Sequence, residues 1–165
     1  MKTRVLGQGL EVSAIGLGCM GMDHAYGAPA DREEMIKLIR RAVELGCNFF
    51  DTAVVYGEAN EVLLGKALEI YNREDVIIAT KFGSYGQKMV DGKPENDLNS
   101  KPDSIREQLE GSLERLGVDY IDLYYQHRVD PEVEPEVVAG VMKELLAEGK
   151  IKHWGLSNAP LDYLR

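Results

Sequence analysis

Short apolar runs alternate with longer segments whose apolar residues recur at helical spacing along most of the chain. The beginning differs, because two short runs at 3–6 and 10–13, separated by Gly7-Gln8-Gly9, predict a β-hairpin. The apolar runs that follow predict strands, and the amphipathic segments between them predict helices. We expect strands at 14–17, 48–51, 76–81, 120–126 and 151–156, and helices at 31–45, 58–70, 103–116 and 134–147.

One stretch fits neither pattern. Residues 83–102 are rich in Gly, Asn, Asp and Ser. A stretch of this length without secondary structure is typical of a functional or a mobile loop. The sequence therefore predicts a long irregular loop after the strand at 76–81.

The alternation of strands and helices predicts a parallel α/β sheet with right-handed crossovers. About five βα units fit either an open doubly wound sheet, such as a flavodoxin-like domain, or part of an eight-stranded barrel. A complete barrel typically needs about 250 residues, and this chain has 165. Barely one helical turn follows the strand at 151–156. We interpret residues 1–165 as a single domain, and as a fragment if the fold is a barrel.

Composition narrows the possible partners and the compartment. Hydrophobic residues make up 44% and charged residues 28% of the chain, as in globular proteins, and the formal net charge is -9. An acidic chain is not expected to bind nucleic acid or an anionic membrane surface. No signal sequence and no apolar run of about 18 residues is visible. Cys19 and Cys47 alone predict neither a disulfide framework nor a zinc site, so we expect a cytoplasmic protein without a metal.

Four polar residues stand at or just after the ends of successive predicted strands. They are Asp51, Tyr56, Lys81 and His127. The carboxyl ends of parallel strands are where α/β proteins assemble their chemistry. A carboxylate, a phenol, an amine and an imidazole that converge there would form a proton-transfer site. The alternative is that the four side chains meet solvent separately.

The segment Gly16-Leu17-Gly18-Cys19-Met20-Gly21 matches the glycine pattern of dinucleotide-binding Rossmann folds. That site needs a helix that begins in the turn and an acidic residue about 20 positions further on. Here the predicted helix begins only at Asp31, and the acid after the second strand is Asp51. The spacing therefore argues against a Rossmann site.

Several motifs stand in the order in which they occur in one known family. They are Gly16-Leu17-Gly18, Asp51-Thr52-Ala53 with Tyr56-Gly57, Asn60-Glu61, Thr80-Lys81-Phe82-Gly83, Gln126-His127 and Gly155-Leu156-Ser157-Asn158. With these motifs the chain resembles the aldo-keto reductases from about residue 3 to its end. The resemblance implies the N-terminal part of a (β/α)8 TIM barrel with an N-terminal β-hairpin cap.

The resemblance also implies NADPH-dependent reduction of aldehydes or ketones, with a small carbonyl compound as substrate. Tyr56 matches the general acid of the family, Asp51 and Lys81 match the pair that tunes it, and His127 matches the residue that orients the carbonyl. For the cofactor, Ser157 and Asn158 match positions that hold the nicotinamide amide. Gly18, Cys19 and Met20 match a loop beside it.

The chain lacks the second half of the family pattern. One alternative is therefore a noncatalytic barrel fragment or scaffold without a working cofactor site. Open barrel edges also predict that the isolated chain self-associates, or that it exists as part of a longer polypeptide. Among the other polar residues, Glu58 and Asn60 are interpreted as substrate contacts or as caps of the helix at 58–70. Trp154 is expected to serve packing and not as a base-stacking platform.

Overall fold

The computed structural model describes residues 1–23, 27 and 30–164. At the N-terminus, β1 (Thr3–Leu6) and β2 (Leu10–Ser13) form an antiparallel hairpin, with Leu6 opposite Leu10. Gly7 and Gly9 have positive φ angles of 50° and 90°, which glycine adopts without steric cost. The predicted hairpin is confirmed.

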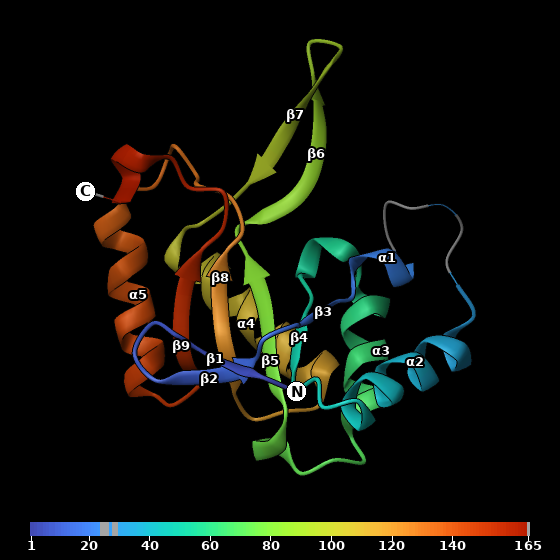
Figure 1. Ribbon diagram of the computed structural model, residues 1–165. Helices are drawn as coiled ribbons and strands as arrows, with labels where there is room; N and C mark the ends of the chain where they lie inside the picture. The colour runs from blue at the N-terminus through green and yellow to red at the C-terminus, as the bar shows by residue number, and fades with distance from the viewer. Residues whose placement is uncertain (24–26, 28–29, 165) are drawn as a thin grey trace.

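The centre of the fold is a parallel five-stranded sheet (Figure 1). Its strands lie in the order β3, β4, β5, β8 and β9, so neighbours in the sheet follow one another along the chain. Their bounds are β3 Leu17–Gly18, β4 Phe49–Asp51, β5 Ile77–Phe82, β8 Ile121–Gln126 and β9 Ile151–Leu156. The predicted parallel order is confirmed, although the strand expected at 14–17 is only two residues long and begins at Leu17.

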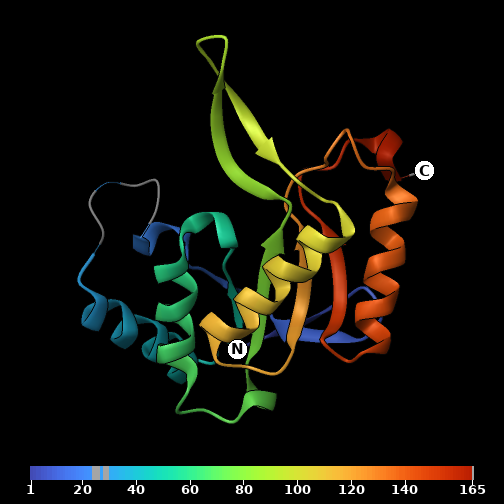
Figure 2. The ribbon, with the colours of Figure 1, turned by 180° about the vertical axis from the view of Figure 1, so that it is seen from behind.

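Four longer helices follow the strands, and α3, α4 and α5 lie over one face of the sheet, with α2 beside α3 (Figures 1 and 2). Sequence signals mark their ends. The side chain of Asp31 accepts a hydrogen bond from the backbone N–H of Glu34 at the start of α2, and Gly117 ends α4 in the left-handed conformation. The bounds are α2 Arg32–Glu44, α3 Glu58–Leu68, α4 Pro102–Leu116 and α5 Pro135–Ala147. Shorter helical turns are α1 Met20–Asp23, η1 Val54–Tyr56, η2 Arg73–Asp75 and η3 Leu161–Leu164.

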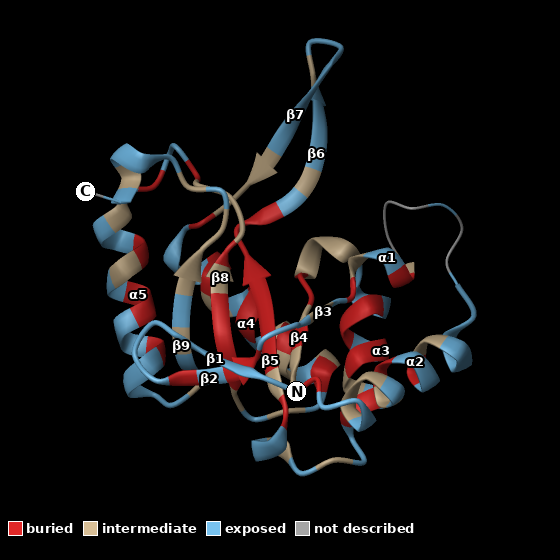
Figure 3. Cartoon of the chain, viewed as in Figure 1, coloured by how far each residue is buried: buried red, intermediate tan, exposed pale blue. Residues whose placement is uncertain are grey.

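The main core lies between the sheet and these helices, where most of the buried residues are found (Figure 3). Phe82 of β5 and Tyr124 of β8 lie there with ring centroids 4.8 Å apart. A smaller cluster contains Leu10 and Val12 of the N-terminal hairpin, together with Ala79 and Leu123 of the sheet. The hairpin therefore covers part of the sheet face that the helices leave open.

The prediction of an irregular loop at 83–102 is wrong. Most of that stretch forms a second antiparallel hairpin from β6 (Ser84–Val90) and β7 (Lys93–Leu98), which projects away from the body of the fold (Figures 1 and 2). Asp91 and Gly92 form its turn, both with positive φ, as a tight hairpin turn requires. The sequence pattern does not predict these two strands, because they are largely solvent-exposed and their sequence lacks apolar alternation.

Candidate active site

Lys81 occupies the centre of the candidate site. It lies near the end of β5, and its side chain is only 8% exposed. Its ammonium nitrogen lies 2.5 Å from Oδ1 of Asp51, 2.7 Å from the carbonyl oxygen of Thr52 and 3.5 Å from the hydroxyl of Tyr56. A buried cation requires such partners, because it has lost its hydration. The last residue of β4 and two residues of the segment that follows it supply them.

Strand register explains why Asp51 meets Lys81. Asp51 ends β4 opposite Ala79 of β5, and Lys81 follows two residues later on the same face of β5. Thr80 and Phe82, on either side of Lys81, face the helices, since Thr80 bonds Glu61 of α3 and Phe82 belongs to the main core. Lys81 is therefore directed to the opposite face.

Tyr56 reaches the lysine from η1, the short turn that follows β4. The backbone N–H of Tyr56 donates to the carbonyl of Ala53, which closes this turn. The Lys81 nitrogen lies 5.1 Å from the centre of the Tyr56 ring, in addition to its contact with the hydroxyl. The ammonium group of Lys81 therefore lies close to both the hydroxyl and the ring of Tyr56.

His127 completes the group directly after β8. Its ring meets that of Tyr56 edge to face, with centroids 5.9 Å apart, and its backbone N–H donates to Phe82. Burial, together with the nearby cations Lys81 and Arg128, lowers the pKa of His127 to about 4. At neutral pH the imidazole is uncharged and has one N–H to donate. The structure thus brings Asp51, Tyr56, Lys81 and His127 together, as expected.

A hollow of about 430 Å³ opens beside this group. It is bounded by Gly16, Leu17 and Gly18 on one side and by Leu156 and Ser157 on the other, with Asp51 and Lys81 between them. Its size lies within the range of about 300–1,000 Å³ that small-molecule sites occupy. Two of the predicted cofactor residues, Gly18 and Ser157, therefore lie beside the candidate proton-transfer group.

The other three predicted cofactor residues do not line this hollow. Cys19 is 1% exposed and lies in the main core, and its burial raises the pKa of the thiol to about 12. Met20 is half-buried at the start of α1, and Asn158 is exposed, with a left-handed φ of 54°. Their part in cofactor binding stays a prediction, and for Cys19 the side chain faces away from the hollow.

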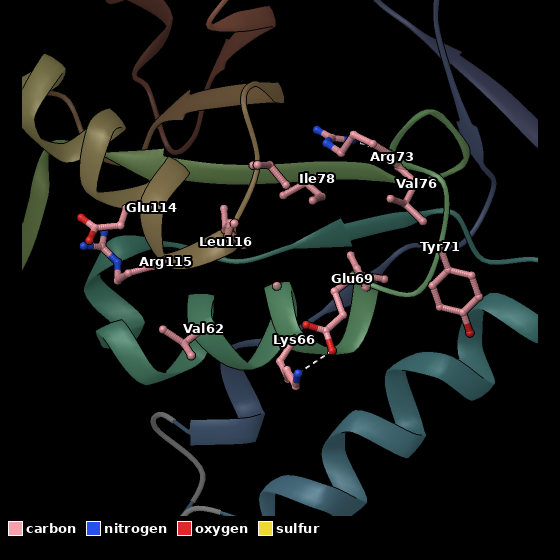
Figure 4. Close-up of a pocket in the computed structure, with 14 residues that line it drawn as sticks. Val62, Lys66, Glu69, Tyr71, Arg73, Val76, Ile78, Glu114, Arg115 and Leu116 are labelled. Atoms are coloured by element: carbon pink, nitrogen blue, oxygen red, sulfur yellow. Dashed lines mark hydrogen bonds and ion pairs between the residues drawn. The ribbon is translucent and has the colours of Figure 1, made fainter.

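Another hollow, of about 390 Å³, lies between α3, α4 and the beginning of β5 (Figure 4). Val76 and Ile78 line it, so it is near the opposite end of β5 from Lys81, and it contains none of the four candidate residues. The two helices come close at Gly65, where a Cβ atom would lie 2.4 Å from the carbonyl oxygen of Leu116. We assign the chemistry to the hollow beside Lys81.

Several polar residues take positions that the sequence did not indicate. Asn60 is fully buried, accepts a hydrogen bond from Thr52 Oγ1 and donates one to the carbonyl of Cys19. The prediction of Asn60 as a substrate contact or helix cap is therefore wrong. Glu58 is exposed in the first turn of α3. Asp122 is paired with Arg73 at 2.5 Å, and Trp154 is 38% exposed.

The described residues do not suggest a metal centre or a membrane segment. Among residues 1–23, 27 and 30–164, no group of three or more His, Cys, Asp or Glu side chains is placed to hold a metal ion. Within the same ranges, no helix has the length and apolar character needed to cross a membrane. A cytoplasmic location stays a prediction.

Comparison with known proteins settles the family. Residues 14–165 match the model of the aldo/keto reductase family. A probable aldo-keto reductase 1 from Glycine max is 48% identical over 159 residues, which are 96% of this chain and 45% of that protein. This chain belongs to the aldo/keto reductase family. The resemblance in the sequence motifs is thereby confirmed.

Solved structures agree on the fold. The thermostable aldo-keto reductase Tm1743, crystallised with the inhibitor epalrestat, is 32% identical, with a TM-score of 0.84 over 99% of this chain and 56% of that one. The holo form of AKR11C1 from Bacillus halodurans is 35% identical, with a TM-score of 0.81 over 95% and 50%. The sheet described above is therefore part of a TIM barrel. The chain spans about half the length of these relatives.

Proposed function

We propose that this aldo/keto reductase chain carries the proton-donating part of a site that reduces aldehydes or ketones to alcohols with a hydride from NADPH. The observation that carries the proposal is the position of the Lys81 ammonium group. It contacts Asp51, the carbonyl of Thr52 and the hydroxyl of Tyr56 at the edge of an open hollow. Membership in the family supports carbonyl oxidoreduction as the reaction class.

The four residues have distinct roles in this proposal. When a hydride adds to a carbonyl carbon, negative charge develops on the oxygen, and Tyr56 donates its hydroxyl proton to that oxygen. Lys81 stabilises the phenolate that remains, and Asp51 keeps the ammonium group in place. The uncharged His127 donates an N–H to the same oxygen and helps to orient it.

The hollow beside Lys81 fits a nicotinamide group. Gly16 and Gly18 contribute backbone without side chains to one wall, and Ser157 contributes to the opposite wall. A Cβ at Gly18 would meet nothing within 4 Å, whereas one at Gly16 would lie 2.8 Å from the ring of Phe49, so this wall is open at Gly18. NADPH, when bound, supplies the hydride. Gly18 and Ser157 would hold its nicotinamide end, and a small carbonyl compound would occupy the space next to Tyr56.

A noncatalytic scaffold is the second candidate. The observation that favours it is the coverage of the relatives, because this chain matches 45% of the Glycine max protein. A chain of this extent would keep the four-residue group whether or not it binds the cofactor. The two candidates differ in one property that can be measured directly, which is the affinity for NADPH.

Fluorescence titration of the purified chain with NADPH and with NADH tests the proposal. Saturable NADPH binding, followed by NADPH oxidation in the presence of aldehydes or ketones, would support the enzyme. Tyr56→Phe is the matched control, since it should keep the binding and lose the oxidation. If neither nucleotide binds, the scaffold becomes the better description of this chain.

A further inference from the structure

Two consecutive residues of α3, Asn60 and Glu61, are both fully buried behind the candidate site. They bond to the two threonines that neighbour the charged pair: Asn60 bonds to Thr52, next to Asp51, and Glu61 bonds to Thr80, next to Lys81. One turn of a helix thus holds the ends of two adjacent strands from the side opposite to the site.

The contact through Asn60 holds the peptide that Lys81 touches. The hydroxyl of Thr52 donates to Oδ1 of Asn60 at 2.7 Å, and the carbonyl of the same Thr52 accepts from the Lys81 ammonium at 2.7 Å. Asn60 in turn donates from Nδ2 to the carbonyl of Cys19 at 2.9 Å. Its side chain therefore links the ends of β3 and β4.

The contact through Glu61 holds β5. Oε1 of Glu61 accepts from Thr80 Oγ1 at 2.7 Å and from Ser112 Oγ at 2.8 Å, and Oε2 accepts from Arg115 Nε at 2.7 Å. A fully buried carboxylate with this set of donors has a fixed position. Because successive side chains of a strand point to opposite faces, fixing Thr80 toward α3 directs Lys81 toward the site.

We propose that Asn60 and Glu61 are positioning residues that hold the Lys81 ammonium against Asp51 and Tyr56. This inference deepens the proposed function and rests on it for its effect on turnover. The competing explanation is that the network only stabilises the packing of α3 on the sheet. That explanation predicts that any buried hydrogen bond in the same layer would have the same effect when it is removed.

Thr80→Val tests the Glu61 contact, since valine keeps the shape of threonine and loses the hydroxyl. Tyr124→Phe is the matched control. Tyr124 lies opposite Thr80 on β8, is fully buried in the same layer and donates to the carbonyl of Ile105 instead of Glu61. Thr80→Ser restores the hydroxyl. Thr52→Val tests the Asn60 contact independently. If Thr80→Val does not fold, Thr52→Val alone tests the positioning role.

The first measurement needs no activity. Reductive methylation of each lysine in the folded chain, quantified by mass spectrometry, reports how firmly each ammonium group is held. Thr80→Val and Thr52→Val should accelerate methylation of Lys81 by about fivefold relative to the other lysines, the factor expected for one lost hydrogen bond. Tyr124→Phe and Thr80→Ser should leave the rate near that of the wild type.

The second measurement is steady-state reduction of a carbonyl compound. The two valine variants should lower kcat, with KM for the carbonyl compound nearly unchanged, whereas Thr80→Ser should recover most of kcat. Equal effects of Thr80→Val and Tyr124→Phe on Lys81 methylation would overturn the positioning role. An inactive wild-type chain that still shows the methylation contrast would count against the proposed function and support the positioning role.

Discussion

The ammonium nitrogen of Lys81 lies 2.5 Å from Oδ1 of Asp51, and the two side chains differ in exposure, at 8% for the lysine and 33% for the aspartate. The cation is therefore the buried partner, and the carboxylate sits at the boundary with the hollow. This arrangement leaves one side of the ammonium group for Tyr56, whose hydroxyl is 3.5 Å away. Asp51 thus neutralises the buried charge of Lys81, and the Lys81 ammonium group lies next to the phenol of Tyr56.

Removal of the Tyr56 hydroxyl is the most direct test of the proton donor. Tyr56→Phe should lower turnover by at least about 10²-fold, the usual minimum contribution of general acid catalysis. NADPH affinity should hardly change, because Tyr56 is not among the residues that line the hollow. Steady-state kinetics and fluorescence titration measure the two quantities. Near-normal turnover by the Phe variant would show that another group donates the proton.

The contribution of Asp51 to the stability of the fold can be measured separately from its contribution to activity. Asp51→Asn should destabilise the fold by about 1–3 kcal/mol, less than for a fully buried pair because Asp51 is one-third exposed. Lys81→Met removes the buried cation and, with it, the need for a counter-charge. In urea unfolding, the double variant should therefore be less destabilised than the sum of the two single variants. Strictly additive effects would show that the pair is not coupled.

The parallel order and the convergence of the four residues could be predicted, because apolar runs mark the strands and parallel strands end at one edge. The hydrogen bonds that α3 makes behind these four residues could not be predicted. Asn60 and Glu61 follow the site motif in the sequence, but their partners Thr52 and Thr80 become evident only when α3 is placed against β4 and β5. The β6–β7 hairpin was missed for another reason, since exposed polar strands carry no apolar alternation. Its Asp91-Gly92 turn was the one available signal.

Acid should destabilise the fold over a pH range that depends on the pKa of His127. Its pKa is lowered from 6.5 to about 4 in the folded chain, so between these values the unfolded chain binds more protons than the folded one. The free energy of unfolding should therefore fall as the pH drops from about 6.5 to about 4. His127→Gln should show a shallower fall in urea titrations at several pH values. His153→Gln, a similar substitution on β9, should keep the contribution of His127. An identical slope in His127→Gln would disprove the assignment.

Cys19 should resist alkylation. Its thiol is 1% exposed, and a pKa of about 12 leaves almost no thiolate at pH 8. Iodoacetamide should label Cys19 much more slowly in the folded chain than in urea, as followed by peptide mass spectrometry. Bound NADPH should make little difference, because the thiol faces the core. Rapid labelling of Cys19 under native conditions, with protection by the nucleotide, would instead place its side chain in the hollow.

The edges of the sheet give the last prediction. Within the part of the chain that the structure describes, β3 and β9 each have a neighbouring strand on one side only, and Trp154 of β9 is 38% exposed. Unpaired backbone groups and exposed apolar surface at an edge favour pairing with another chain, and each Å² of apolar surface removed from water contributes about 25 cal/mol. We therefore expect the isolated 165-residue chain to self-associate.

Sedimentation velocity at several concentrations measures this association. Trp154→Lys should weaken it, because a charge on an edge strand opposes pairing. Val62→Lys is the control, since Val62 is 41% exposed on α3, and this helix packs between α2 and α4 and not against β9. Equal weakening by the two variants would point to general surface effects and not to β9. A stable monomer of 18.4 kDa with cooperative unfolding would contradict the prediction, because it would show that the five-stranded sheet is stable with both edges open.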